Sequence, residues 1–225
     1  MQVRTVVRSI GVWCAGVAIA GGLAVSGALP AMAEEGTGNM VFFKGGYMNM
    51  TKDRGGQFFS DLGGAAGVNG GNDGWYVGGG LDLVMSKNAW GGMDKTWVVG
   101  EIGMQFNRIN SSTVASFPSS AAITGVPEKV QLTMVTIDVA PKIKFMEGSA
   151  FRPWIIPVGL DIHVISPPSN QTQYLDLGMQ FGAGFEVQVW KAFMLGVDAR
   201  YHLTAKMTNT NNDYFQVGPY VGISF

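Results

Sequence analysis

The fold is decided by one stretch of sequence, Tyr174-Leu-Asp-Leu-Gly-Met-Gln-Phe-Gly-Ala-Gly-Phe-Glu-Val-Gln-Val189. Every second residue from Leu175 to Val189 is apolar, and the residues between them are Asp, Gly, Gln or Glu. Successive side chains of a β-strand point to opposite faces. The stretch is therefore predicted to be one long strand with an apolar and a polar face.

The same alternation recurs along the rest of the chain. It is clear over residues 154–164 and 193–204, and noisier over 40–48, 75–86, 98–107, 130–145 and 213–225. Together these segments predict eight strands. Within the noisy segment 130–145, the apolar positions change from even to odd numbers at Met134, which predicts a β-bulge there.

The connections between these strands alternate between long and short. In chain order they cover residues 50–73, 87–95, 110–129, 146–151, 166–173, 190–192 and 207–212. Long loops on one side and short turns on the other are typical of outer-membrane barrels. An even number of strands also places both chain termini on the side of the short turns.

The composition favours a membrane protein. The chain has 33 Gly, 47% hydrophobic residues and only 14% charged residues. No apolar run after residue 33 reaches the length of about 20 residues that a spanning helix needs. In the alternative, a soluble barrel, the apolar face would point inward, but eight strands enclose little space. We place the large residues Phe181, Phe185, Trp154 and Ile156 outside, and predict an all-β, eight-stranded antiparallel transmembrane up-and-down β-barrel.

The N-terminus has the pattern of a cleaved signal peptide. Arg4 and Arg8 precede an apolar stretch, and Ala31-Met-Ala33 offers the small residues that a signal peptidase requires. The alternative is an N-terminal membrane anchor. We expect residues 1–33 to be removed with Cys14, and residues 34–225 to form one barrel domain without disulfides.

The polar face of the strands is expected to line the lumen as a polar network. Its members are Asp82, Glu101, Asp138, Lys142, Lys144, Asp161, His163, Asp176, Glu186, Asp198, Arg200 and His202, and we also place Lys206 there. Charges in so narrow a space must pair, which predicts a rigid, salt-bridged interior. The alternative is a narrow, weakly selective path for water or solutes.

Catalysis would need a nucleophile beside a histidine. His163 and Ser166 are three residues apart and fall on opposite faces of a regular strand. His202 and Thr204 share a face, although Thr is a poor nucleophile for this role. We therefore expect no enzyme, no catalytic residue, no cofactor and no metal site, with a lipid A-modifying barrel enzyme as the minor alternative.

Three segments resemble the small outer-membrane barrels related to outer-membrane protein A and outer-membrane protein X, a porin-family type of Gram-negative bacteria. They are Gln216-Val-Gly218-Pro-Tyr-Val221-Gly-Ile223-Ser-Phe225, Phe151-Arg-Pro-Trp154 and Gly196-Val-Asp-Ala-Arg-Tyr201. The resemblance implies the fold and a place in the bacterial outer membrane. It also implies that Gly218, Val221, Ile223 and Phe225 form the C-terminal signal for the barrel-assembly machinery.

The expected partners follow from this location. They are outer-membrane lipid and lipopolysaccharide, and an extracellular partner at the loops 50–73 and 110–129. The weak net charge of −1 argues against nucleic acid. The expected function is a structural or surface-interaction role with at most weak passive permeation. The alternative is a narrow channel for small hydrophobic or polar solutes, like the outer-membrane protein W family.

Overall fold

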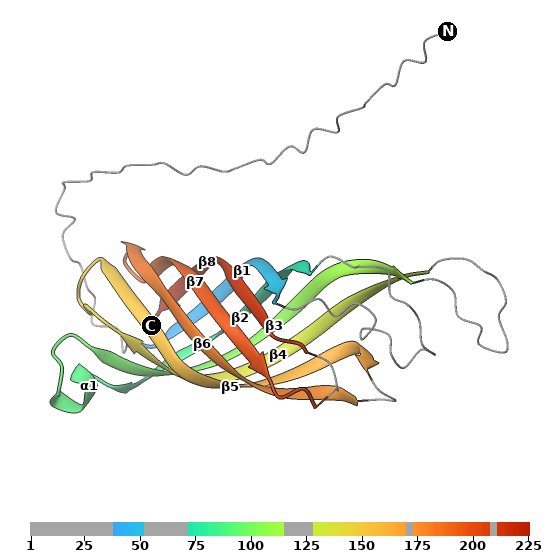
Figure 1. Cartoon of the computed structure of the whole chain (residues 1–225). Coiled ribbons are helices and arrows are strands. Elements are labelled where there is room, and N and C mark those ends of the chain that lie inside the picture. Colours follow the sequence, from blue (N-terminus) through green and yellow to red (C-terminus); the bar gives the residue numbers. More distant parts are fainter. Residues whose placement is uncertain (1–37, 52–71, 115–127, 170–172, 208–210) are drawn as a thin grey trace, which may run out of the picture. The chain divides into compact units, whose positions relative to one another are not determined.

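A computed structural model describes residues 38–51, 72–114, 128–169, 173–207 and 211–225. They form a closed barrel in which every strand is antiparallel to its sequence neighbours and β8 closes onto β1 (Figure 1). The expected fold, an eight-stranded antiparallel up-and-down barrel, is thus confirmed. The strands are β1 (Met40–Met50), β2 (Asp73–Ser86), β3 (Trp97–Val114), β4 (Glu128–Lys144), β5 (Phe151–Ser169), β6 (Gln173–Trp190), β7 (Phe193–Thr204) and β8 (Tyr214–Ser224).

The one helix of the described residues is short. Helix α1 (Asn88–Gly91) lies in the connection between β2 and β3. No helix in the described part of the chain is long and apolar enough to cross a bilayer. The expected signal peptide, residues 1–33, lies outside the described residues.

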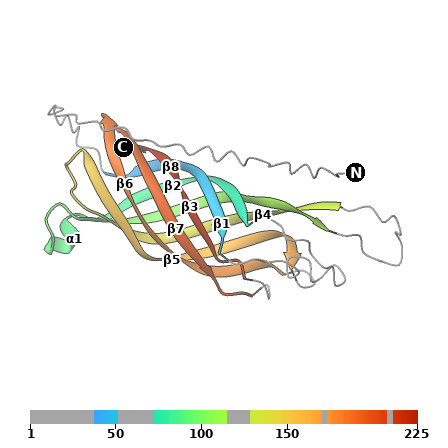
Figure 2. The same ribbon diagram turned by 45° about the horizontal axis from the view of Figure 1, so that its top comes forward.

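The two ends of the barrel differ in their connections. At one end, here called the turn end, lie the connections 87–96, 145–150 and 191–192 together with the C-terminus (Figure 1). At the other, the loop end, β3 and β4 remain paired as far as Val114 and Glu128 and extend beyond the other strands (Figure 2). Most of the predicted loops 50–73 and 110–129 lies outside the described residues.

The outer surface of the barrel is apolar all the way round. Large hydrophobic side chains are exposed on every strand, for example Phe43, Leu81, Ile102, Ile137, Leu160, Leu177, Leu195 and Val221. Many of the alternate residues are polar and buried inside, where Asp82, Glu101 and Arg200 are at most 1% exposed. A soluble barrel has the opposite arrangement, so the barrel is built for an apolar surrounding.

The predicted outward position of Trp154 and Ile156 is wrong. Both side chains point into the lumen and are at most 2% exposed, whereas Leu160 on the same strand is 68% exposed. The pairing of β5 with β6 shifts register between Ile156 and Gly159, around Pro157. Because proline has no N–H to donate, it interrupts the ladder, and the bulge exchanges the two faces of the strand.

The predicted bulge near Met134 is not found in β4 from Met134 onward; the pairing of β3 with β4 shifts register between Arg108 and Ser111, opposite Thr133 and Gln131. From Met134 to Lys144, even-numbered residues of β4 point inward and odd-numbered residues point outward without interruption. Met134 is 1% exposed because it packs in an apolar layer inside the lumen. The change of phase in the sequence therefore marks a lumen residue that is apolar, and the strand itself continues regularly.

Glycines form the seam at which the barrel closes. Gly45 and Gly46 of β1 lie opposite Gly218 of β8, and a Cβ atom added to Gly218 would lie 2.1 Å from the carbonyl oxygen of Gly45. Only a residue without a side chain allows the two backbones to approach so closely.

Candidate functional site

All twelve residues of the expected polar network point into the lumen. Their exposed fractions range from 0 to 3%. The prediction that Lys206 lies in the lumen is wrong, because its side chain is exposed beyond the end of β7. The sequence did not predict that Lys44 also lines the lumen, where it is 3% exposed. It shares the inward face of β1 with Phe42 and Met48, so its even number was the available sequence signal.

A continuous chain of ion pairs crosses the lumen on the side of the turn end. Lys144 Nζ lies 3.2 Å from Glu186 Oε2 and 2.9 Å from Asp82 Oδ2. Lys142 Nζ lies 3.1 Å from Asp82 Oδ1 and also pairs with Glu101. The chain thereby links β2, β3 and β4 to β6, which is adjacent to none of them around the barrel.

Arg200 ends this chain and holds the largest number of acidic partners. Its guanidinium lies 2.5 Å from Glu101 Oε1 and 2.6 Å from Asp198 Oδ2, and it donates to Gln180 Oε1 at 3.0 Å. Asp138 Oδ2 lies 3.8 Å away. The planar, permanently charged guanidinium suits such a site, because it offers several donors in fixed directions.

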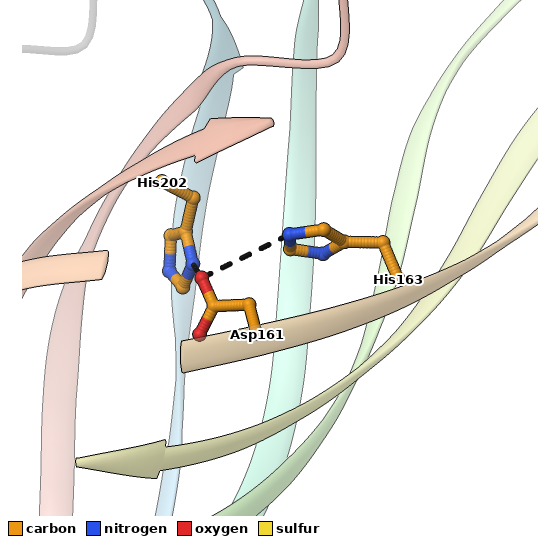
Figure 3. A group of neighbouring side chains, drawn as sticks. All are labelled: Asp161, His163 and His202. Carbon is orange, nitrogen blue, oxygen red and sulfur yellow. Dashed lines mark hydrogen bonds and ion pairs between the residues drawn. The ribbon is translucent and has the colours of Figure 1, made fainter. Parts of the chain in front are cut away.

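A second group lies further toward the loop end and contains both histidines of the chain (Figure 3). His202 Nδ1 lies 2.7 Å from Asp161 Oδ2, and His163 Nε2 lies 3.8 Å from the same oxygen. The sequence predicts that Asp161 and His163 share a face of β5. It does not show that His202, on β7, reaches them past Gly178 of β6, where an added Cβ would lie 2.8 Å from His163 Nε2.

Uncharged polar side chains surround this histidine group. Thr136 Oγ1 lies 3.0 Å from His163 Nδ1 and accepts a hydrogen bond from Asn107 Nδ2 at 3.1 Å. The Tyr214 ring stacks on His202 with centroids 4.2 Å apart, and its hydroxyl accepts from Gln105 Nε2 at 3.1 Å. Strand alternation places these side chains on the inward face, whereas their contacts depend on the register between strands.

Two layers of apolar side chains divide the lumen, and the sequence predicted neither of them. The layer at the loop end contains Met48, Met50, Tyr76, Ile109, Met134, Ile165 and Tyr214. The layer at the turn end contains Met40, Phe42, Ala140, Trp154, Ile156, Met194 and Tyr220. The inward side chains at these levels are almost inaccessible to solvent, so they fill the described part of the lumen.

Asp176 lies apart from the ion-pair chain. It accepts hydrogen bonds from Asn212 Nδ2 at 2.8 Å and from the Met207 amide at 3.1 Å. Asp213 accepts from the Thr204 amide at 2.8 Å in the same connection. These contacts bind the segment between β7 and β8 to the loop end of the barrel.

The connection between β4 and β5 carries one buried acid outside the strands. Glu147 pairs with Arg152 at 3.1 Å and is 7% exposed. Burial raises the pKa of the Glu147 carboxyl, and the neighbouring Arg152 charge opposes this rise only in part.

The residue pairs considered for catalysis do not form a nucleophile–base arrangement. His163 is fully buried in the lumen, whereas Ser166 is exposed on the outer surface. His202 and Thr204 both point inward, but the Thr204 hydroxyl donates to Asp213 Oδ1 at 3.1 Å. The expectation that His163 and Ser166 lie on opposite faces agrees with these positions.

At the C-terminus, the predicted assembly residues occupy strand β8 and its end. Gly218 is buried in the seam with β1, Val221 and Phe225 are exposed, and Ile223 is half-buried. The amide of Phe225 donates to the carbonyl of Asn39 at 2.9 Å, so the last residue is fixed to the start of the barrel.

Comparisons with known proteins find distant similarity to solved structures alone. No protein-family model and no curated protein matches the chain. Among solved structures, the chain is similar to the outer membrane enzyme PagL, with 14% identity over 83% of this chain and 99% of that one, at a TM-score of 0.47. It is also similar to Neisserial surface protein A, with 14% identity over 85% and 100% of the chains and a TM-score of 0.48. The third is the Yersinia pestis outer membrane protein Ail, with 14% identity, coverage of 84% and 99%, and a TM-score of 0.37.

The fold of this chain rests on its own strand pairing, a closed eight-stranded barrel. At such low identity the similarity carries nothing about activity.

Proposed function

We propose that the protein is a bacterial outer-membrane barrel that holds its surface loops on a rigid support, without catalysis and with at most weak passive permeation. Residues 1–33 are its cleaved signal peptide. One observation carries the proposal: the exterior is apolar on every strand, while the interior is filled by ion pairs and two apolar layers.

The filled interior favours the structural role over the narrow channel. A conducting path needs polar surface in contact with water along the whole barrel axis. Here the lumen charges of the ion-pair chain are at most 3% exposed, and their partners are other side chains. Single-channel recordings in planar bilayers test this choice. We expect no conductance steps, and regular steps would favour the channel.

Membrane insertion and export are tested together on gels. Outer-membrane fractions are run cold and boiled, and the intact mass is measured. We expect a band that shifts on heating and a mass corresponding to a chain that begins at Glu34. A band that does not shift, or that stays in the periplasmic fraction, would refute the membrane barrel.

The enzyme alternative has a separate test. Lipid A is isolated from cells with and without the gene and compared by mass spectrometry. Because Ser166 lies outside the barrel and His163 inside it, we expect identical spectra. A change in acyl chains or headgroups that depends on the gene would show a lipid A-modifying activity.

A further inference from the structure

Buried polar atoms without hydrogen bonds gather around Asp161, His163 and His202 (Figure 3). One ring nitrogen or carboxylate oxygen from each residue lies within 4.8 Å of those of the other two, and all three side chains are at most 2% exposed. Among the described residues, His163 Nε2 and Asp161 Oδ1 have no hydrogen-bond partner. A buried polar atom that is left unpaired is costly, so the cluster calls for a further binding partner.

The surroundings hold the ligand atoms in place. When His163 Nδ1 donates to Thr136 Oγ1 at 3.0 Å, the lone pair of Nε2 faces Asp161. The stacked Tyr214 ring fixes the plane of His202. Contacts of this kind, from a ring nitrogen to a neighbouring acceptor, orient histidine ligands in metal sites.

The charge of the lumen favours a bound cation. Among the described strands, seven buried carboxylates face four buried cations: Asp82, Glu101, Asp138, Asp161, Asp176, Glu186 and Asp198 against Lys44, Lys142, Lys144 and Arg200. Asp138 and Asp161 are direct cross-strand neighbours, and both Asp138 oxygens lack a hydrogen bond. Two carboxylates side by side in a dry interior repel each other, and a nearby cation relieves that repulsion.

We propose that Asp161, His163 and His202 bind one divalent transition-metal ion, for which Zn²⁺ is the best fit. Two imidazole nitrogens and one carboxylate oxygen are a common zinc ligand set, with bonds of about 2.0–2.2 Å. Around a tetrahedral ion such ligand atoms lie roughly 3.3 Å apart. Asp161 Oδ2 lies 2.7 and 3.8 Å from the two imidazole nitrogens, on either side of that value, and all three ligand atoms lie within 4.8 Å of one another. The two imidazole rings must therefore rotate toward each other to bind the ion.

The ion has a structural role. It joins β5 to β7 across β6, directly below the apolar layer of the loop end, to which Tyr214 belongs. The three side chains supply three of the four ligands that Zn²⁺ usually takes. The sequence predicted no metal site. The meeting of His202 with the other two residues depends on the strand register, which the sequence does not show.

The test uses untagged protein, because the chain has only two histidines and both are in the site. The full chain is expressed, purified from membranes in detergent, unfolded in urea with a chelator, and refolded with Zn²⁺ or without it. We expect one Zn²⁺ per chain after gel filtration and a higher urea midpoint with the metal. Zinc X-ray absorption should show imidazole scattering.

Variants separate this site from nonspecific binding. H163Q and D161N should each lower Zn²⁺ affinity by at least 100-fold. E186Q, which removes a buried carboxylate of the ion-pair chain but no ligand, should change it by less than 10-fold. The proposal is overturned if the refolded wild-type chain keeps no zinc, or if H163Q and D161N bind it as tightly as wild type. If these variants fail to fold, the absorption spectrum of the wild-type protein decides, and zinc without imidazole ligands overturns the proposal.

Discussion

Replacing Arg200 with Met tests whether water is excluded from the ion-pair chain. Arg200 is 1% exposed and lies within 2.5 to 3.8 Å of three carboxylates, those of Glu101, Asp198 and Asp138. Met keeps an unbranched apolar stem but lacks the guanidinium group, so the change removes the charge together with its hydrogen-bond donors.

The expected loss of stability follows from the carboxylates that lose the Arg200 charge. Removing one member of a buried ion pair costs about 3–5 kcal/mol, because the other charge is left without compensation. Coulomb's law gives the same order, about 4 kcal/mol for charges 4 Å apart at an effective dielectric constant of about 20. We expect R200M to lower the free energy of unfolding by about 3–5 kcal/mol, since Asp198 loses its ion-pair partner and Glu101 keeps only Lys142.

Urea unfolding in detergent, followed by tryptophan fluorescence and by heat-dependent gel migration, measures this difference. K191M is the matched control, because it removes an exposed cation and should change stability by less than about 0.5 kcal/mol. Adding D198N to R200M should restore part of the lost stability, because it removes one of the carboxylates that R200M leaves unpaired. A loss below about 1 kcal/mol for R200M would refute the reasoning. It would mean that water reaches the network, which would favour the channel.

Three further predictions address the exterior, the seam and the turn end. L160K places a charge on the most exposed part of β5 and should destabilise the barrel by about 2–4 kcal/mol in bilayers if Leu160 faces mid-membrane lipid; an unchanged urea midpoint in vesicles would argue against a lipid-facing surface. G218A puts a Cβ atom 2.1 Å from the Gly45 carbonyl oxygen, so the band that shifts on heating should weaken or disappear; a normal shift would show that the seam adapts. Because burial raises the pKa of Glu147, the folded chain keeps this proton at pH values where the unfolded chain has lost it. Stability should therefore fall as pH rises through the ordinary Glu range, about pH 4–5, and E147Q should show a smaller fall in its urea midpoints.

Much of the barrel was predictable because its alternation is a local property. The apolar outward residues of β6 and β7 could be read directly from the sequence, and so could the inward position of all twelve charged and histidine residues. The errors arose where an apolar residue points inward. Trp154 and Met134 look like lipid-facing residues, because hydrophobicity does not distinguish lipid from an apolar layer in the lumen.

The partners of the lumen residues were not predictable for a different reason. Lys142 and Asp82 are 60 positions apart, and their contact depends on the register of every strand between them. Each bulge changes that register, and one residue of slip moves a side chain to the other face. The register shift around Pro157 is an example, since it brings Trp154 under the Lys142 ammonium, 4.8 Å from its ring centroid. The histidine cluster depends on the same information.

The filled lumen also bears on where a partner binds. If lipid covers the exterior and side chains occupy the interior, the rims are the surfaces that remain in water. At the loop end the paired β3 and β4 continue to Val114 and Glu128, whereas β1 ends at Met50. The segment between β3 and β4 thus starts furthest from the barrel, on a hydrogen-bonded hairpin whose stiffness reduces the entropy lost on binding. Of the two loops proposed for an extracellular partner, 110–129 is therefore the one whose supporting strands extend further from the barrel.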